Sequence, residues 1–132
     1  MATTAKLTLV SSDLLSDALD LEVTQTLYKA GASTDIALAT GLARYSAGTT
    51  SETKILEADD YTDNKAAKLY IKNTSTTRSD YIYLTLGTAG SSSTIGRLYG
   101  GEWALIPWSG ASDINLNQSG ASIVIEWMLF YE

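Results

Sequence analysis

The segment SIVIEWMLFYE, residues 122–132, decides the fold because its side chains alternate with a period of two. That period is typical of a β-strand, in which successive side chains point to opposite faces of the sheet. One face of the expected strand carries Ile123, Ile125, Trp127, Leu129 and Tyr131, and the other carries Val124, Glu126, Met128 and Phe130. Both faces are largely apolar, so both need cover from water.

A two-layer sandwich buries only one face of each sheet, so the second face of this strand needs separate cover. Loops of the same chain, a further layer or another subunit could supply it, and the alternation leaves these possibilities open. A contiguous exposed apolar patch of roughly several hundred Å² marks an interface in most soluble proteins. We therefore expect a homo-oligomer, with Trp127, Met128 and Phe130 in the core or in the subunit contact.

The rest of the chain also alternates. The pattern is clearest in LDLEVTQTLYK (19–29) and recurs in AKLTLV (5–10). KLYIKN (68–73) and DYIYLTLG (80–87) are predicted to pair as antiparallel strands across the turn TSTTRS, whereas SGASDINLNQSG (109–120) is interpreted as a connection. About eight to ten short strands and no long helix predict an all-β fold, an antiparallel sandwich of jelly-roll type.

The composition narrows the function. The chain has 132 residues, which suits a single domain spanning 1–132, and it contains neither cysteine nor histidine. Disulfides, thiolate metal sites and the usual histidine base are thereby excluded. With 9 basic and 15 acidic residues the net charge is −6, so nucleic acid is not an expected partner. No apolar run is long enough for a membrane helix, and the first fifteen residues lack a secretory leader, so synthesis in a cytoplasm is expected.

Two sets of acidic residues could carry chemistry. Asp59, Asp60, Asp63 and Asn64 place hard oxygens in one loop, but they lack the glycine and the closing glutamate of a calcium loop, which favours a solvated turn. Glu102, Asp113 and Glu126 match glycosidase carboxylates by residue type only. We therefore expect no catalytic residue, no metal and no cofactor.

The segment EWALIPW, residues 102–108, holds two of the three tryptophans and the only proline. Trp103 shares a strand face with Leu105, and Trp108 has the opposite parity. Trp103 is predicted to lie in the core or in a subunit contact, and Trp108 and Arg97 at the rim of an interface. A sugar-stacking platform that combines an exposed tryptophan with Tyr70, Tyr81 or Tyr83 is the alternative.

Four stretches carry a resemblance to a known group of proteins: GLARYSAGTT (41–50), EADDYTDNKAAKLYIKNTSTTRSDYIYL (57–84), IGRLYGGEWALIPWSGASDI (95–114) and VIEWMLFYE (124–132). They resemble small virion proteins of tailed bacteriophages, especially phages of marine cyanobacteria. The resemblance covers the chain from about residue 41 to its end and transfers no active-site residue. It implies a capsid decoration (cement) protein or a small head or tail component. Small decoration proteins are commonly trimeric, so we expect a homotrimer, or alternatively a homodimer, on the outside of the virion. The expected partner is the major capsid protein or another virion protein.

Three functions follow as hypotheses. The first is a non-enzymatic decoration protein that oligomerises and stabilises a phage shell, with Arg97, Trp103, Trp108, Trp127, Met128 and Phe130 as interface candidates. The second is a carbohydrate- or receptor-binding sandwich of a phage tail. The third is a small hydrolase, which would need convergent carboxylates in a cleft.

Overall fold

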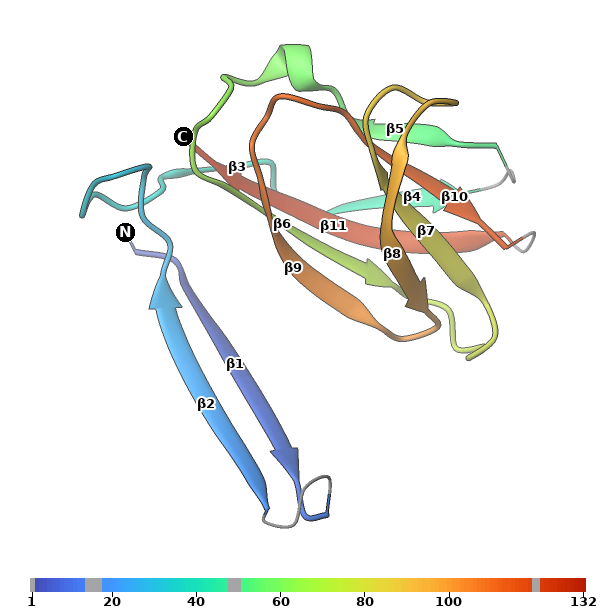
Figure 1. The fold of residues 1–132 in the computed structure, drawn as a ribbon, viewed down its shortest axis with the longest axis horizontal. Helices are drawn as coiled ribbons and strands as arrows, with labels where there is room; N and C mark the ends of the chain where they lie inside the picture. Colours follow the sequence, from blue (N-terminus) through green and yellow to red (C-terminus); the bar gives the residue numbers. More distant parts are fainter. Residues whose placement is uncertain (1, 14–17, 48–50, 120–121) are drawn as a thin grey trace.

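The computed structural model describes residues 2–13, 18–47, 51–119 and 122–132. Every strand pairing in these ranges is antiparallel. One 3₁₀ turn, η1 (Ala58–Asp60), interrupts an otherwise all-β chain (Figure 1). The described ranges hold eleven strands, one more than the upper end of the prediction: β1 (Thr4–Ser11), β2 (Leu19–Thr26), β3 (Leu38–Ala39), β4 (Ala43–Ala47), β5 (Thr53–Leu56), β6 (Ala67–Asn73), β7 (Tyr81–Leu86), β8 (Ser93–Tyr99), β9 (Trp103–Trp108), β10 (Ile114–Gln118) and β11 (Ile123–Tyr131).

Two sheets pack face to face and form the sandwich, which confirms the predicted fold class. One sheet has the order β5–β10–β7–β8, and the other has the order β3–β11–β6–β9, with β4 also paired to β11. The core between them is a single cluster of buried side chains that includes Leu69, Ile71, Ile82, Leu116 and Leu129. Burying each of these aliphatic side chains contributes about 1.5–3 kcal/mol relative to exposure, so this cluster is the main source of stability.

Strand β11 is the longest strand and lies in the interior of its sheet, with β6 on one side and β3 and β4 on the other. Its inner residues Ile123, Ile125 and Leu129 are fully buried, as the alternation predicts. The outer face is only partly covered, because Val124 is 39% exposed and both Met128 and Phe130 are half-buried. The chain's own loops therefore do not seal this face.

Two sequence predictions about the strands are wrong. Strands β6 and β7 do not pair with each other but belong to opposite sheets, so residues 74–80 form an arch between the layers. The physical reason is that Leu69 and Ile82 both need burial, and the arch lets them point from opposite sheets into one core cluster. The segment interpreted as a connection contains β10, an interior strand of the other sheet, in which Asn115 is fully buried and donates a hydrogen bond to the Gly87 carbonyl (2.6 Å).

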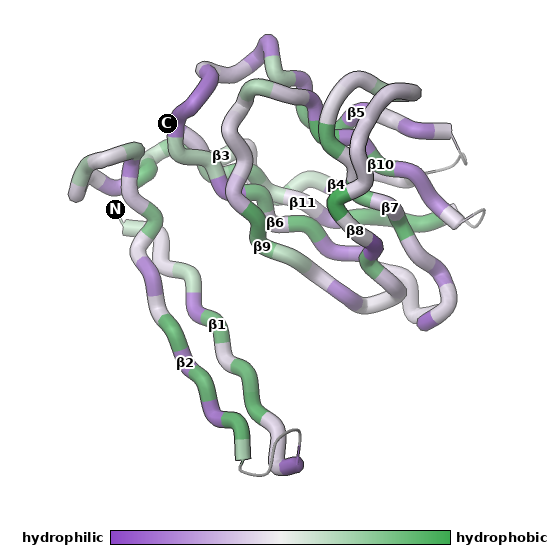
Figure 2. The backbone as a smooth tube through the Cα atoms, viewed as in Figure 1, coloured by the Kyte–Doolittle hydropathy of each residue, from purple (hydrophilic) through white to green (hydrophobic). Residues whose placement is uncertain are grey.

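Strands β1 and β2 form a third sheet of their own, a hairpin that projects from the sandwich (Figure 1). Its base is tied down where the Leu27 amide donates to the Thr3 carbonyl (2.9 Å) and where Tyr28 and Asp35 form an isolated bridge. Leu27 and Ile36 are buried there, apart from the main core. Figure 2 shows apolar residues recurring along both strands out to the far end of the projection.

Candidate interaction surface

The hairpin has one apolar face, and that face is exposed. The cross-strand pairs Leu7–Val23 and Leu9–Leu21 share it, whereas Thr8 and its partner Glu22 lie on the opposite face. The four apolar side chains are 38–50% exposed. An isolated two-stranded hairpin is marginally stable in water, so cover for this face would stabilise the projecting conformation.

A second apolar area lies on the outer face of the sheet that contains β9, β6 and β11. The register places Met128 opposite Tyr70 and Tyr70 opposite Leu105, so one row of side chains crosses the three strands. In the neighbouring row, Trp103 lies opposite Lys72 and is 54% exposed. A large exposed indole beside other apolar side chains is typical of a protein interface.

The charges on this outer face are mainly positive. Its charged side chains are three basic and one acidic: Arg44, Lys68, Lys72 and Glu126. Glu126 accepts from the Arg44 guanidinium (3.4 Å) and from the Tyr70 hydroxyl (3.5 Å). Burial, followed by the negative charge of Glu126, raises the pKa of Tyr70. The hydroxyl therefore stays protonated at neutral pH and acts as a donor on this face.

A groove of about 290 Å³ separates the base of the hairpin from the outer face of β9. Leu7 and Val23 line one wall, and Trp103 and Leu105 line the other. Leu9 and Leu21, farther out on the hairpin, do not line it. The hairpin and its own sheet thus form two apolar walls with open space between them.

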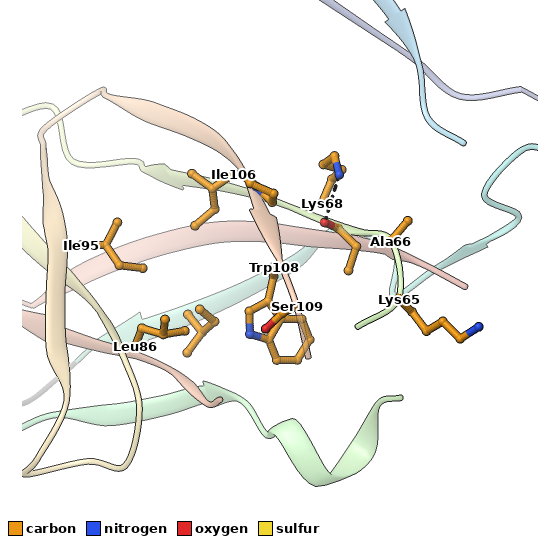
Figure 3. Close-up of a pocket in the computed structure, with 11 residues that line it drawn as sticks. Lys65, Ala66, Lys68, Leu86, Ile95, Ile106, Trp108 and Ser109 are labelled. Carbon is orange, nitrogen blue, oxygen red and sulfur yellow. Dashed lines mark hydrogen bonds between the residues drawn. The ribbon is translucent and has the colours of Figure 1, made fainter. Parts of the chain in front are cut away.

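The side of the sandwich between the edge strands β8 and β9 is also open. Figure 3 shows this hollow, where Ile95 and Leu86 lie across from Ile106 and Trp108. Its volume is about 420 Å³. Pro107 lies on the edge strand β9, where it removes a backbone donor and discourages unspecific strand addition.

The outer face of the other sheet, which contains β7 and β8, carries aromatic and charged side chains beside a polar groove. The Arg97 guanidinium lies 4.6 Å from the ring centres of both Tyr81 and Tyr83 and donates to the Tyr83 hydroxyl (2.6 Å). Beside this cluster lies a polar groove of about 360 Å³ that Glu52 helps to line. Glu52 accepts hydrogen bonds from the Gly90 amide (2.7 Å) and from the hydroxyls of Ser92 and Thr85. These donors, the Gly90 amide first, lower the pKa of the Glu52 carboxyl.

The predicted interface residues divide between several places. Trp103, Met128 and Phe130 lie on the outer face of one sheet, each in a different cross-strand row. Trp127 lies on the inner face of β11, half-buried against the core, and Arg97 lies on the opposite sheet.

The prediction that Trp108 lies at the rim of an interface is wrong. Trp108 is 4% exposed, packs edge-on against Tyr61 (5.1 Å between ring centres) and donates its indole N–H to the Ser112 carbonyl (2.8 Å). Trp108 is thus a core residue and Trp103 the exposed one, because β9 turns its Trp108 face toward the second sheet.

Sequence reasoning missed the exposed hairpin face as a candidate surface. The alternation in residues 5–10 and 19–27 predicts one apolar face, but it does not show that this face lies outside the sandwich.

The acidic candidates have separate structural roles. Asp113 pairs with Lys54 (2.8 Å) and accepts from the Ala58 amide (2.9 Å), and that amide and then Lys54 lower the pKa of its carboxyl. Glu102 accepts from the Tyr99 amide (2.9 Å) in the turn before β9. Among the described residues, neither side chain shares a hydrogen-bond or ion-pair partner with Glu126. Among the described residues, no group of three or more acidic side chains is arranged to hold a metal ion, including the loop of Asp59 to Asn64.

Comparison of the chain with protein-family models, with curated proteins and with solved structures finds no match. Within the described ranges, no helix has the length and hydrophobicity that a membrane crossing requires.

Proposed function

We propose that this chain is a non-enzymatic structural protein of a bacteriophage virion, a decoration protein that self-assembles, as a trimer by preference, and binds the shell. One observation supports the proposal most: a single copy leaves two apolar surfaces uncovered, the hairpin face around Leu9 and Leu21 and the outer face around Trp103. The resemblance of residues 41–132 to small phage virion proteins supplies the setting.

The mechanism follows from mass action. A protein that binds only the assembled shell stabilises that shell by its binding free energy. Many such contacts, repeated over a lattice and linked within each oligomer, reinforce one another because the second contact of an oligomer is effectively intramolecular. No bond is made or broken, so the function needs no catalytic residue.

Sedimentation of the purified chain tests the self-assembly. We expect a mass of three chains at micromolar concentration. Replacing Met128 and Phe130 together by serine should dissociate the oligomer while each monomer stays folded by circular dichroism, because both side chains lie half-buried on the outer face. Thr94→Ser on β8 of the other sheet is the matched control. A monomeric wild-type chain would remove self-assembly from the proposal.

Localisation tests the virion role. The chain should copurify with intact particles, and its density should lie on the outside of the shell. Particles that lack the chain should rupture at lower temperature than complete ones. Absence of the chain from purified particles would refute the proposal.

Glycan recognition is a second candidate function, which the tyrosine and arginine cluster beside the polar groove favours. Aromatic rings next to hydrogen-bonding groups are what a sugar ring needs for stacking and orientation. Binding to a glycan array should then be lost with Tyr83→Ala and kept with Trp103→Ala, which changes the opposite face. No binding by the wild-type chain would exclude this candidate.

A further inference from the structure

We propose that the apolar face of the β1–β2 hairpin packs on the outer face of β9, β6 and β11 of a second copy of the chain. This inference deepens the proposed self-assembly and rests on it. A second copy of the chain then covers both surfaces, because the hairpin face of one copy packs on the outer sheet face of its neighbour.

The first step is that the hairpin cannot cover its face on its own sandwich. Of the two apolar pairs, only Leu7 and Val23 line the groove against Trp103, together with Ala5, Lys6 and Gln25. The distal pair Leu9 and Leu21 lies farther along the projection, which extends away from both sheets (Figure 1). Two exposed leucines on an unsupported two-stranded ribbon therefore need a wall from another molecule.

The second step is charge. In residues 2–13 and 18–26 the hairpin carries one basic side chain, Lys6, and three acidic ones, Asp13, Asp20 and Glu22. The outer face of the sheet carries three basic side chains and one acidic side chain, as described above. Lys6, Asp20 and Glu22 lie on the hairpin face opposite the apolar pairs, so they do not pair directly with the sheet. The net negative charge of the hairpin still attracts the net positive outer face over the thickness of one ribbon, which favours a hairpin on a sheet face. Two hairpins packed on each other would bring like charges together, which disfavours that arrangement.

The third step is area. Eight residues at ~3.4 Å each and two strands at ~4.8 Å spacing give the hairpin a face of about 260 Å². A hairpin on a sheet then buries about 520 Å² in total, and a copy that donates one hairpin and accepts another takes part in about 1,000 Å² of contact. When two copies exchange hairpins, both contacts belong to one interface, which then reaches the lower limit of about 1,000 Å² for a specific interface. In a ring of three, each interface buries about 520 Å², and closure of the ring adds to its stability because the last contact is intramolecular.

The absence of cysteine from the chain makes the test direct, because any introduced thiol is the only one in its molecule. Leu9→Cys and Leu105→Cys are prepared as separate proteins, one of them with a mass tag, mixed, and treated with a short bis-maleimide. We expect a cross-linked pair that contains one chain of each kind. Thr8→Cys is the matched control, since its side chain lies on the opposite face of the hairpin, and its yield with Leu105→Cys should be several-fold lower.

Every outcome decides the inference. A Leu9→Cys chain that cross-links to itself in preference to Leu105→Cys would show hairpins packed on each other and overturn it, as would equal yields from Leu9→Cys and Thr8→Cys. Leu9→Ser with Leu21→Ser should raise the dissociation constant of the oligomer by about tenfold or more in sedimentation, and an unchanged constant would also overturn it. If the chain is found on particles without the Leu9–Leu105 cross-link, only this inference fails and the virion role stands.

Discussion

Asn73 offers the sharpest test of how the two sheets are held together. It is fully buried at the end of β6, where the chain leaves one layer for the other. Its side-chain amide donates to the carbonyls of Asp80 (3.2 Å) and Leu98 (3.0 Å), and its side-chain oxygen accepts from the Ser75 amide (3.0 Å). One side chain thus fixes the arch of residues 74–80 to strand β8.

Replacing Asn73 by alanine removes all three hydrogen bonds and leaves two carbonyls and one amide without that partner. At roughly 1 kcal/mol for each bond, and somewhat more where the abandoned group stays dry, the free energy of unfolding should fall by about 3–4 kcal/mol. A domain of this kind has about 5–15 kcal/mol in total, so the loss is a large fraction of it. With a dependence of about 1.5 kcal/mol per molar urea, the unfolding midpoint should fall by about 2 M.

The assay is urea unfolding followed by circular dichroism at one fixed protein concentration, because self-association would shift the midpoint. Asn117→Ala on β10 is the matched control. The Asn117 side chain is half-buried and makes no hydrogen bond to another described residue, so its loss should cost less than about 1 kcal/mol. A loss below about 1 kcal/mol for Asn73→Ala would mean that other contacts hold the arch, and the reasoning would be refuted.

Three further predictions follow from the same structure. Trp108→Phe should lower the free energy of unfolding by about 2–3 kcal/mol, because it removes the hydrogen bond to Ser112 and part of a buried ring. Trp103→Phe should change the free energy of unfolding of the monomer by less than about 0.5 kcal/mol, because Trp103 is exposed. Equal effects would contradict the assignment of Trp108 to the core and Trp103 to the surface. Gly100→Ala should lose about 3 kcal/mol or more in the same assay, because a β-carbon there would lie 2.2 Å from the Thr77 carbonyl oxygen, while Gly96→Ala, with open space around it, should be tolerated. The pKa of the Glu52 carboxyl is lower in the folded chain than its ordinary value of 4.5, so its contribution to stability is present above that value and is lost as the pH falls further. The free energy of unfolding of Glu52→Gln should therefore fall less steeply in acid than that of the wild-type chain. The same dependence on pH for both proteins would count against this role of Glu52.

The sequence predicts the all-β class well because alternation is a local signal, and β11, β2 and β7 all carry it. Strand β10 was missed because INLNQ places two asparagines among its apolar residues, and only the Gly87 carbonyl on the neighbouring turn makes a buried Asn115 acceptable. The false pairing of β6 with β7 has a similar origin. A short polar segment between two strands fits a hairpin and an arch equally well, and the choice depends on which faces meet across the core.

The candidate surface was predictable only in part. Parity separates Trp103 from Trp108, but which of them is buried depends on the side from which the second sheet approaches, and that is a long-range property. Met128 and Phe130 were expected in the core or in a contact, and the structure places them half-buried on the outer face, where the contact itself stays a prediction. The hairpin could not be singled out, since an apolar strand face looks the same in a sequence whether a core covers it or water does.

The length of the hairpin has a mechanical consequence. A ribbon of eight-residue strands acts as a lever of about 27 Å that is fixed near Leu27 and Ile36. Turning it by about 10° at that pivot displaces its far end by about 5 Å, which is as wide as the spacing between neighbouring strands. The same hairpin side chains could then reach neighbouring molecules that lie at unequal distances on a curved surface. Only the residues around the pivot would need to change conformation.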